Sequence, residues 1–303
     1  AIQYYVVSSC GINITKTKLV CVDDKFVYLG DNNYKNLIKS FDVTEEVKKQ
    51  SKDVPQYIKD FKKLSSSSVD CPDISIGEHC KDPYPCIYKS TCESENKDNN
   101  LIDYTVLPNI RKKALKEYID EENITTNIQD IPMNLLNPQQ KIVLNSHLTG
   151  QEYLNPELKK ILKKYEWPFY FMDFEFVQQF VPIIKNTKSH ESIPFQWSVH
   201  EWSNIDSKVE IKDGYNFLDF SSDDIEVKFI ESLLKVLKNK GTIFAHNATT
   251  EITVLKRLLA KDNCKKFKDQ ITQVILRIED TYKLAKDYFY NTKMKGKYGL
   301  KQI

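Results

Sequence analysis

The stretch from Tyr170 to Phe176, Tyr-Phe-Met-Asp-Phe-Glu-Phe, places two carboxylates inside an apolar run. Alternate side chains of a strand point to the same face, so Asp173 and Glu175 are predicted to project together. Two neighbouring acids repel each other and are costly to desolvate. A shared divalent cation is the usual way to offset both effects, and such sites commonly carry out phosphoryl chemistry. We therefore interpret this strand as one side of a metal site.

The composition is that of an ordinary soluble protein. The 303 residues suffice for several domains, and the net charge of +2 means that any basic surface must be local. No apolar run approaches the ~20 residues of a membrane span, so we expect no membrane partner. The uneven cysteines and the lack of a signal peptide predict a reducing, cytoplasmic location. Both ends read as interrupted elements, so we expect a piece of a longer protein.

The first half of the chain predicts mostly short elements. Strands are expected at 20–22 and 25–29, with Asp23-Asp24 as the turn between them, followed by a helix over 45–63. Further helices are expected at 110–119, 138–148 and 155–165, with 124–132 as a helical-hairpin turn. We divide the chain into a small α+β region (1–70), a cysteine-rich knuckle (71–95), a helical connector (96–165) and a final domain (166–303).

The final domain predicts an α/β fold with a mixed sheet flanked by helices. Three strands come first and are followed by alternating helices and strands, which is the order of a mixed sheet. The expected strands are 169–176, 193–202, 209–220, 242–246 and 274–278. The expected helices are 222–238, 249–260 and 281–290.

The element order and its acids resemble the DnaQ-like (DEDD) 3′–5′ exonucleases of the ribonuclease H fold. Asp173 and Glu175 match the Asp-x-Glu of that family's first strand. His246-Asn247-Ala248-Thr249-Thr250-Glu251 resembles its His-Asn-x-x-x-Asp motif, with Glu in place of Asp. Ile278-Glu279-Asp280-Thr281-Tyr282 resembles its next strand-to-helix junction. The family's fourth acid would lie beyond Ile303.

This resemblance implies a two-metal mechanism with Mg²⁺ or Mn²⁺. Asp173 would bridge both ions, Glu175 would hold the ion on the nucleophile side, and Glu251 would support the second ion. Asp280 either joins this metal site or only caps the helix that follows it. The implied activity is hydrolysis of DNA or RNA from a single-stranded 3′ end, weak or lost in a chain that lacks the fourth acid.

A second group of residues is expected at the substrate. The resemblance implies that His246 and Asn247 shape the substrate groove. Lys295 and Lys297, with Tyr298 beside them, could follow a phosphate backbone. The alternative is that these lysines form a solvated basic loop.

The cysteine-rich knuckle contains Cys71, Cys80, Cys86 and Cys92. The last three resemble the cysteine triplet of RecB-like nucleases, including CRISPR-associated ones, which hold a [4Fe–4S] cluster with a fourth cysteine from upstream. Alternatively, Cys71 completes a local site for zinc or a cluster, or the thiols are free. More narrowly, residues 193–200 and 287–298 resemble an uncharacterised bacterial family that joins a RecB-like region to a DnaQ-like domain. Residues 1–70 would then be a partial RecB-like remnant.

Two other classes of function remain open at this point. One is a nucleic-acid-binding module with a degenerate nuclease site, favoured by Glu in place of Asp at position 251. The other is a structural scaffold, in which Asp173 and Glu175 would each pair with a Lys or Arg.

Overall fold

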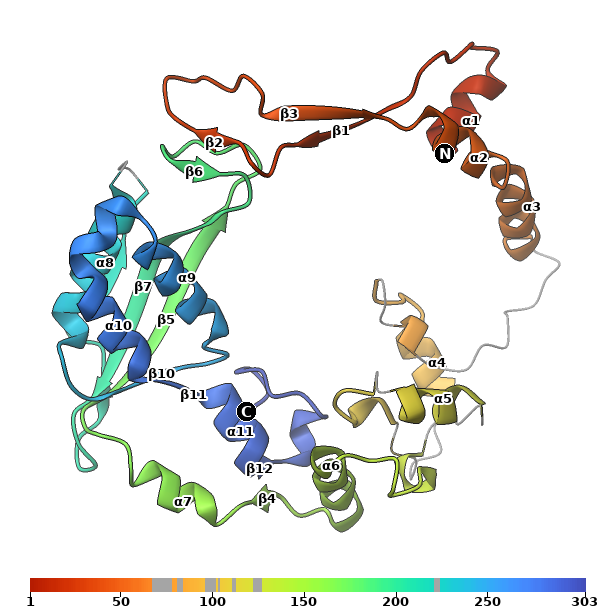
Figure 1. The fold of residues 1–303 in the computed structure, drawn as a ribbon. Helices are drawn as coiled ribbons and strands as arrows, with labels where there is room; N and C mark the ends of the chain where they lie inside the picture. The colour runs from red at the N-terminus through yellow and green to blue at the C-terminus, as the bar shows by residue number, and fades with distance from the viewer. Residues whose placement is uncertain are drawn as a thin grey trace. The chain divides into compact units, whose positions relative to one another are not determined.

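The computed structural model describes residues 1–66, 78–80, 84–95, 102, 104–110, 113–121, 127–220 and 224–303. The chain divides into two compact units, whose elements are labelled in Figure 1. The first unit contains Ala1–Asp73 and Val177–Ile193, and the second contains Ile74–Phe176 and Pro194–Ile303. Residues 177–193 therefore group with the N-terminal residues, although the sequence division left them inside the final domain.

The first unit is built from short elements. Its helices are α1 (Ile2–Ser9), α2 (Thr44–Ser51) and α3 (Val54–Leu64), and its strands are β1 (Lys18–Val22), β2 (Val27–Tyr28), β3 (Ile38–Asp42) and β6 (Thr187–Lys188). β1 pairs antiparallel with β3, and β2 pairs antiparallel with β6. The strands predicted at 20–22 and 25–29 correspond to β1 and β2, but the two do not pair with each other. Asp31, Asn32 and Asn36 have positive φ, so the chain bends repeatedly before it returns as β3.

The single helix predicted over 45–63 is divided into α2 and α3. Pro55 is the second residue of α3 and has no N–H with which to continue a helix from α2. Proline is well tolerated in a first helical turn, where the N–H groups have no partner within the helix. The break therefore follows from the position of this proline.

The first part of the second unit is mainly helical. Its elements are η1 (Glu78–Cys80), α4 (Lys89–Glu95), η2 (Tyr104–Val106), α5 (Lys113–Glu121), η3 (Ile128–Asp130), α6 (Pro138–Thr149), β4 (Tyr153–Leu154) and α7 (Glu157–Leu162). The helix predicted at 138–148 is confirmed as α6. Asn137 and Gln140 form a capping box at its start, and Gly150 ends it in the left-handed conformation, with φ of 68°.

A mixed sheet forms the centre of the second unit, as predicted. Its strands are β5 (Phe169–Gln178), β7 (Ser192–Trp202), β8 (Val209–Glu210), β9 (Asn216–Leu218), β10 (Thr242–Ala245) and β11 (Ile278–Asp280). The order is β11-β10-β5-β7-β8, and β9 also pairs with β7. β10 is parallel to both β5 and β11, whereas β8 and β9 run antiparallel to β7.

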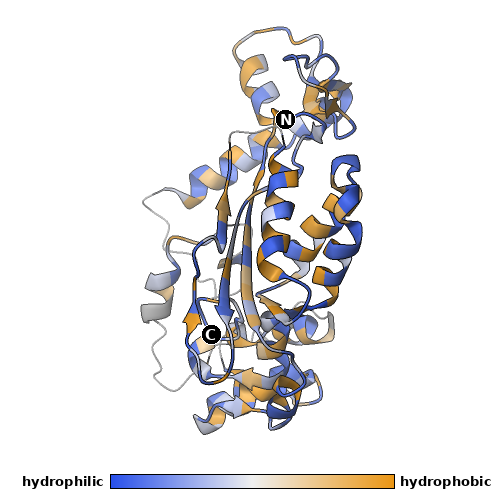
Figure 2. Ribbon diagram, turned by 90° about the vertical axis from the view of Figure 1, so that its left-hand side faces the viewer, coloured by the Kyte–Doolittle hydropathy of each residue, from blue (hydrophilic) through white to orange (hydrophobic). Residues whose placement is uncertain are grey.

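Helices pack against one face of this sheet. They are α8 (Ile225–Leu237), α9 (Thr249–Leu259), η4 (Asp262–Phe267) and α10 (Lys268–Leu276). Tyr170, Met172 and Phe174 of β5 enter the same core as Phe229 of α8 and Leu255 of α9. Figure 2 shows the alternating hydrophobic and hydrophilic bands of these amphipathic helices. None of the described helices has the length and apolar character of a bilayer span.

Two predicted strands are wrong in part. Residues 274–276 belong to α10, because Ile271 and Val274 lie one helical turn apart and are both buried in the core. The strand β11 begins only at Ile278. The strand expected over 209–220 is interrupted by a turn at Gly214, whose φ is 78°, which leaves β8 and β9 as separate short strands.

The helical connector shares a second core with the end of the chain. The chain continues after β11 as α11 (Thr281–Tyr288), β12 (Phe289–Tyr290) and η5 (Thr292–Met294). Tyr290, Met294 and Tyr298 pack in one cluster with Leu115 of α5. Gly296 lies so close to the connector that an added Cβ would meet the carbonyl oxygen of Val106. The connector and the final domain therefore fold against each other.

Candidate metal site

Asp173 and Glu175 lie on β5 with their side chains exposed on the same face. Phe174, which lies between them, and Met172, which precedes Asp173, are buried in the core on the opposite face. The predicted alternation is confirmed. Neither acid has an ion pair or hydrogen bond with any residue that the structure describes. The lysine or arginine partners that a purely structural role would require are not found there.

Glu251 lies in the first turn of α9 and is only 6% exposed. Burial raises the pKa of its carboxyl, its own backbone N–H opposes this, and the charges of Asp173 and Asp280 raise the pKa further. Its Oε2 is buried and has no hydrogen-bond partner among the described residues. Asp173 of β5 and Asp280 of β11 are thus near enough to affect the carboxyl of Glu251 on α9.

Asp280 ends β11 and is the N-cap of α11. Its Oδ1 accepts hydrogen bonds from the backbone N–H of Tyr282 at 2.9 Å and of Lys283 at 3.4 Å. It also accepts one from the backbone N–H of Asn247 at 2.9 Å. The helix cap considered from the sequence is therefore present. Because Asp280 also affects the pKa of Glu251, capping and proximity to the acids occur together.

His246 follows β10 and is held at both ring nitrogens. Nε2 lies 2.9 Å from the carbonyl oxygen of Tyr298, and Nδ1 lies 3.0 Å from Oγ1 of Thr281. A carbonyl oxygen only accepts, so Nε2 carries a proton, and the Thr281 hydroxyl beside Nδ1 also lies 3.4 Å from the carbonyl oxygen of Ala245. Through the hydrogen bond from Nε2, His246 connects the backbone at Tyr298 to the end of β10. The contact between His246 and Thr281 was not predicted, although the sequence already placed Thr281 at the strand-to-helix junction.

The other residues expected at the substrate separate into two groups. Asn247, Lys295 and Lys297 are exposed, and the described part of the chain contains no acid paired with either lysine. Tyr298 is only 3% exposed, with its ring centroid 6.2 Å from that of Tyr282. Its ring therefore packs in the second core, beside Tyr282 and Tyr290, and does not face a groove.

These acids do not form a closed ligand set. No three His, Cys, Asp or Glu side chains within the described ranges lie close enough together to hold one metal ion. The exposed side chains of Asp173 and Glu175 can change rotamer without disturbing the core, whereas Glu251 is held by burial.

The cysteines of the knuckle are only partly described. Cys80 is buried, Cys86 is exposed and Cys92 is half-buried, and the N–H of Cys86 donates to the carbonyl of Cys80 at 3.0 Å. Cys71 lies outside the described residues.

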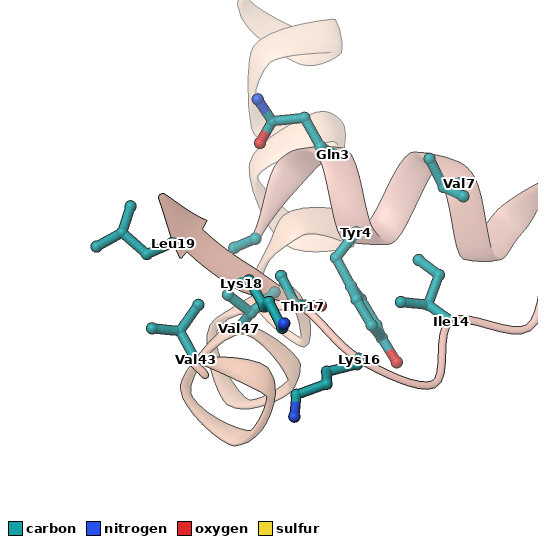
Figure 3. A pocket seen from close by; sticks show the side chains of 11 residues that line it. Gln3, Tyr4, Val7, Ile14, Lys16, Thr17, Lys18, Leu19, Val43 and Val47 are labelled. Atoms are coloured by element: carbon teal, nitrogen blue, oxygen red, sulfur yellow. The ribbon is translucent and has the colours of Figure 1, made fainter. Parts of the chain in front are cut away.

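A cavity of about 420 Å³ lies in the first unit, beside α1 and β1. Figure 3 shows its mixed wall, in which apolar side chains such as Val7 and Val47 meet the basic Lys16 and Lys18. Among the residues that the structure describes, no Asp, Glu, His or Cys side chain lines it. The cavity therefore lacks the side chains of a metal site.

Residues 170–299 match a family described as a domain of unknown function (DUF2779). The match spans less than half of the chain and includes Asp173, Glu175, Glu251 and Asp280. No curated protein and no solved structure matches the chain.

Proposed function

We propose that Asp173, Glu175 and Glu251, with Asp280 beside them, bind Mg²⁺ or Mn²⁺ and that the protein is a metal-dependent nuclease. The observation that carries this proposal is the buried Oε2 of Glu251, which has no partner among the described residues and lies near two other carboxylates. Burying a carboxylate oxygen without a donor or cation is costly. A divalent cation would supply the missing partner.

The donor set fits a hard cation. All four side chains offer carboxylate oxygens, which Mg²⁺ and Mn²⁺ prefer over nitrogen or sulfur. Asp173 would bridge two ions, Glu175 would hold one and Glu251 the other. When bound, two such ions activate a water and stabilise the leaving oxygen of a phosphodiester. Asp280, with Oδ1 used by backbone N–H groups, retains Oδ2 for an ion or its water.

The order of the strands supports a ribonuclease H-like fold. β5, β10 and β11 are neighbours and parallel, so Asp173, Glu251 and Asp280 come from adjacent strands or from the helix that directly follows one. This arrangement agrees with the resemblance to DnaQ-like 3′–5′ exonucleases. The 3′–5′ direction rests on that resemblance alone.

The proposed substrate is a single-stranded end of DNA or RNA. Asn247, Lys295 and Lys297 offer an amide and two cations to solvent. Phosphate contacts of this kind give binding that weakens steeply with salt. A cytoplasmic location is part of the same proposal.

For the knuckle we propose a [4Fe–4S] cluster held by Cys80, Cys86 and Cys92 with one further cysteine, and zinc as the alternative. Anaerobic purification distinguishes the two. A cluster gives a brown protein that absorbs at about 400 nm, whereas a zinc site is colourless.

A nucleic-acid-binding module is the second candidate. It is favoured by the open arrangement of the acids, which do not enclose an ion among the described residues, and by Glu at position 251. It predicts binding of nucleic acid that does not depend on metal.

The deciding experiment measures Mn²⁺ binding by titration calorimetry, then digestion of end-labelled single-stranded DNA and RNA. We expect wild type to bind Mn²⁺, and Asp173→Asn and Glu251→Gln to lose binding. Glu210→Gln, on the exposed end of β8, is the matched control and should bind normally. Equal Mn²⁺ binding by all four proteins would rule out the proposed site. Nucleic-acid binding that persists in Asp173→Asn without metal would favour the second candidate.

A further inference from the structure

The turn between β10 and α9 brings Asn247 next to the end of β11. β10 and β11 are parallel, with Ala245 opposite Asp280 in the pairing register. Asn247 comes two residues after Ala245 and has φ of 61°, in the left-handed region. Asn tolerates this conformation better than most residues with a Cβ, and Gly tolerates it best.

Asn247 contacts Asp280 through its backbone N–H. Its N–H donates to Oδ1 of Asp280 at 2.9 Å. Its side chain is exposed and forms no hydrogen bond with any described residue. The left-handed conformation turns the chain toward α9 directly after this N–H, so the turn and the hydrogen bond occur at the same residue.

Asp280 receives three backbone N–H groups on one oxygen. Those of Tyr282 and Lys283 come from α11, and that of Asn247 comes from the neighbouring turn. The third bond joins the ends of two strands through one carboxylate. It fixes the rotation of the carboxyl group and leaves Oδ2 without a partner among the described residues.

We propose that the backbone of Asn247 is a positioning element for the metal site: its N–H holds Oδ1 of Asp280 and leaves Oδ2 available to a cation that Glu251 would also bind. The inference rests on the proposed function. It gives the backbone of Asn247 a role at the metal, whereas the sequence predicted Asn247 only at the substrate groove.

Three substitutions at position 247 separate the backbone from the side chain. Asn247→Gly removes the side chain and keeps the left-handed turn, whereas Asn247→Ala and Asn247→Val oppose that turn, Val more strongly. The probe is Mn²⁺ alone, measured by titration calorimetry without nucleic acid. We expect Gly to bind as wild type does and Val to bind about 10-fold more weakly, with Ala between them, as for loss of an outer-shell contact. Asn186→Val, at another left-handed Asn with φ of 63°, is the control and should not change Mn²⁺ affinity.

A double-mutant cycle tests the contact without any metal. Asn247→Val and Asp280→Asn both weaken the same N–H···Oδ1 bond, so their effects on the urea midpoint should sum to more than that of the double variant. Additive effects would overturn the inference. So would an Asn247→Gly protein that has lost Mn²⁺ binding, because the side chain and not the backbone would then be responsible. Coupling in this cycle together with no Mn²⁺ binding by wild type would reject the proposed function while leaving the contact itself intact.

Discussion

Two regions of the second unit each contain a buried glutamate. The one among the helices that cover the sheet forms ion pairs with basic side chains, whereas the one at the edge where β10 and β11 end does not do so with any residue that the structure describes. Glu226 of α8 is 5% exposed and forms ion pairs of 2.6 Å with both Arg257 and Lys261. Glu251 of α9 is buried to nearly the same degree, at 6% exposed. Its Oε2 has no partner in the described chain, and its charged neighbours are two more acids.

Glu201 of β7 extends this comparison. Burial opposes its ionisation, but hydrogen bonds from Lys212 at 2.6 Å and Tyr215 at 2.7 Å help to hold its pKa at about 2. The pKa of Glu251 is raised instead. Glu201 and Glu226 are therefore buried together with cations, whereas the charged neighbours of Glu251 are acids, and this difference marks the candidate metal site.

The largest expected effect is on the paired glutamate. Glu226→Gln leaves Arg257 and Lys261 without their carboxylate, and we expect a loss of about 3 kcal/mol in the free energy of unfolding, measured with urea. Glu231→Gln, on the exposed side of α8 with a looser contact to Lys235 at 3.9 Å, should lose less than about 0.5 kcal/mol. Similar losses in both variants would remove the distinction between buried and exposed pairs.

A slightly smaller effect is expected when Mn²⁺ is added. At about 100 times its Kd, Mn²⁺ should raise the unfolding free energy of wild type by about 2.7 kcal/mol. Glu251→Gln should lose this gain, because its amide cannot replace the anionic ligand, and Glu210→Gln should keep it. A full gain in Glu251→Gln would show that Mn²⁺ binds elsewhere.

Without metal, Glu251→Gln should stabilise the protein by about 1 kcal/mol at neutral pH. The raised pKa means that the folded state binds the proton more tightly than the unfolded state. Glu251 thus reduces the stability of the folded state as the pH rises above 4.5, the ordinary pKa of a glutamate, and through the higher pKa that Glu251 has in the folded state. Urea midpoints across that range should fall in wild type and stay level in the variant. The opposite slope would mean that the donors to the Glu251 carboxyl outweigh the effect of its burial.

The smallest expected effect concerns a buried base. Nε2 of His147 lies 3.0 Å from the Tyr290 hydroxyl, and burial lowers the pKa of His147 below its ordinary 6.5. The neutral imidazole accepts a hydrogen bond from the Tyr290 hydroxyl. Its contribution to stability is therefore complete above pH 6.5 and is lost as the pH falls through the lower pKa of His147 in the folded state. We expect less than about 1 kcal/mol, seen as a urea midpoint that falls with acid in wild type but less in His147→Gln. Equal pH dependence would assign the fall to other groups.

Much of the sheet region was predictable from local patterns. The alternation around Asp173 and the strand at 193–202 depend on side chains two residues apart, and these appear in β5 and β7. The beginning of α9 after the His246-Asn247 turn was also recognised. Val274 was assigned to a strand because a short run of β-branched and apolar residues does not show its period, and packing against the core made it helical.

The first unit was predicted less well. The partner of β1 is β3, separated from it by a bend of residues with positive φ, and β2 pairs with β6 from a distant part of the chain. Pairing of this kind depends on where a loop returns, and no local pattern records it.

The sequence by itself determined that two carboxylates share one face of β5 and that a third acid begins a helix after a strand, because strand alternation and helix starts are local properties. The tertiary structure decided which buried glutamates are neutralised. Lys212, Arg257 and Lys261 reach Glu201 and Glu226 from other turns and helices, while Asp173 and Asp280 are brought near Glu251 by the parallel pairing of their strands. Electrostatic partners are set by distance in space, and only the folded chain defines those distances.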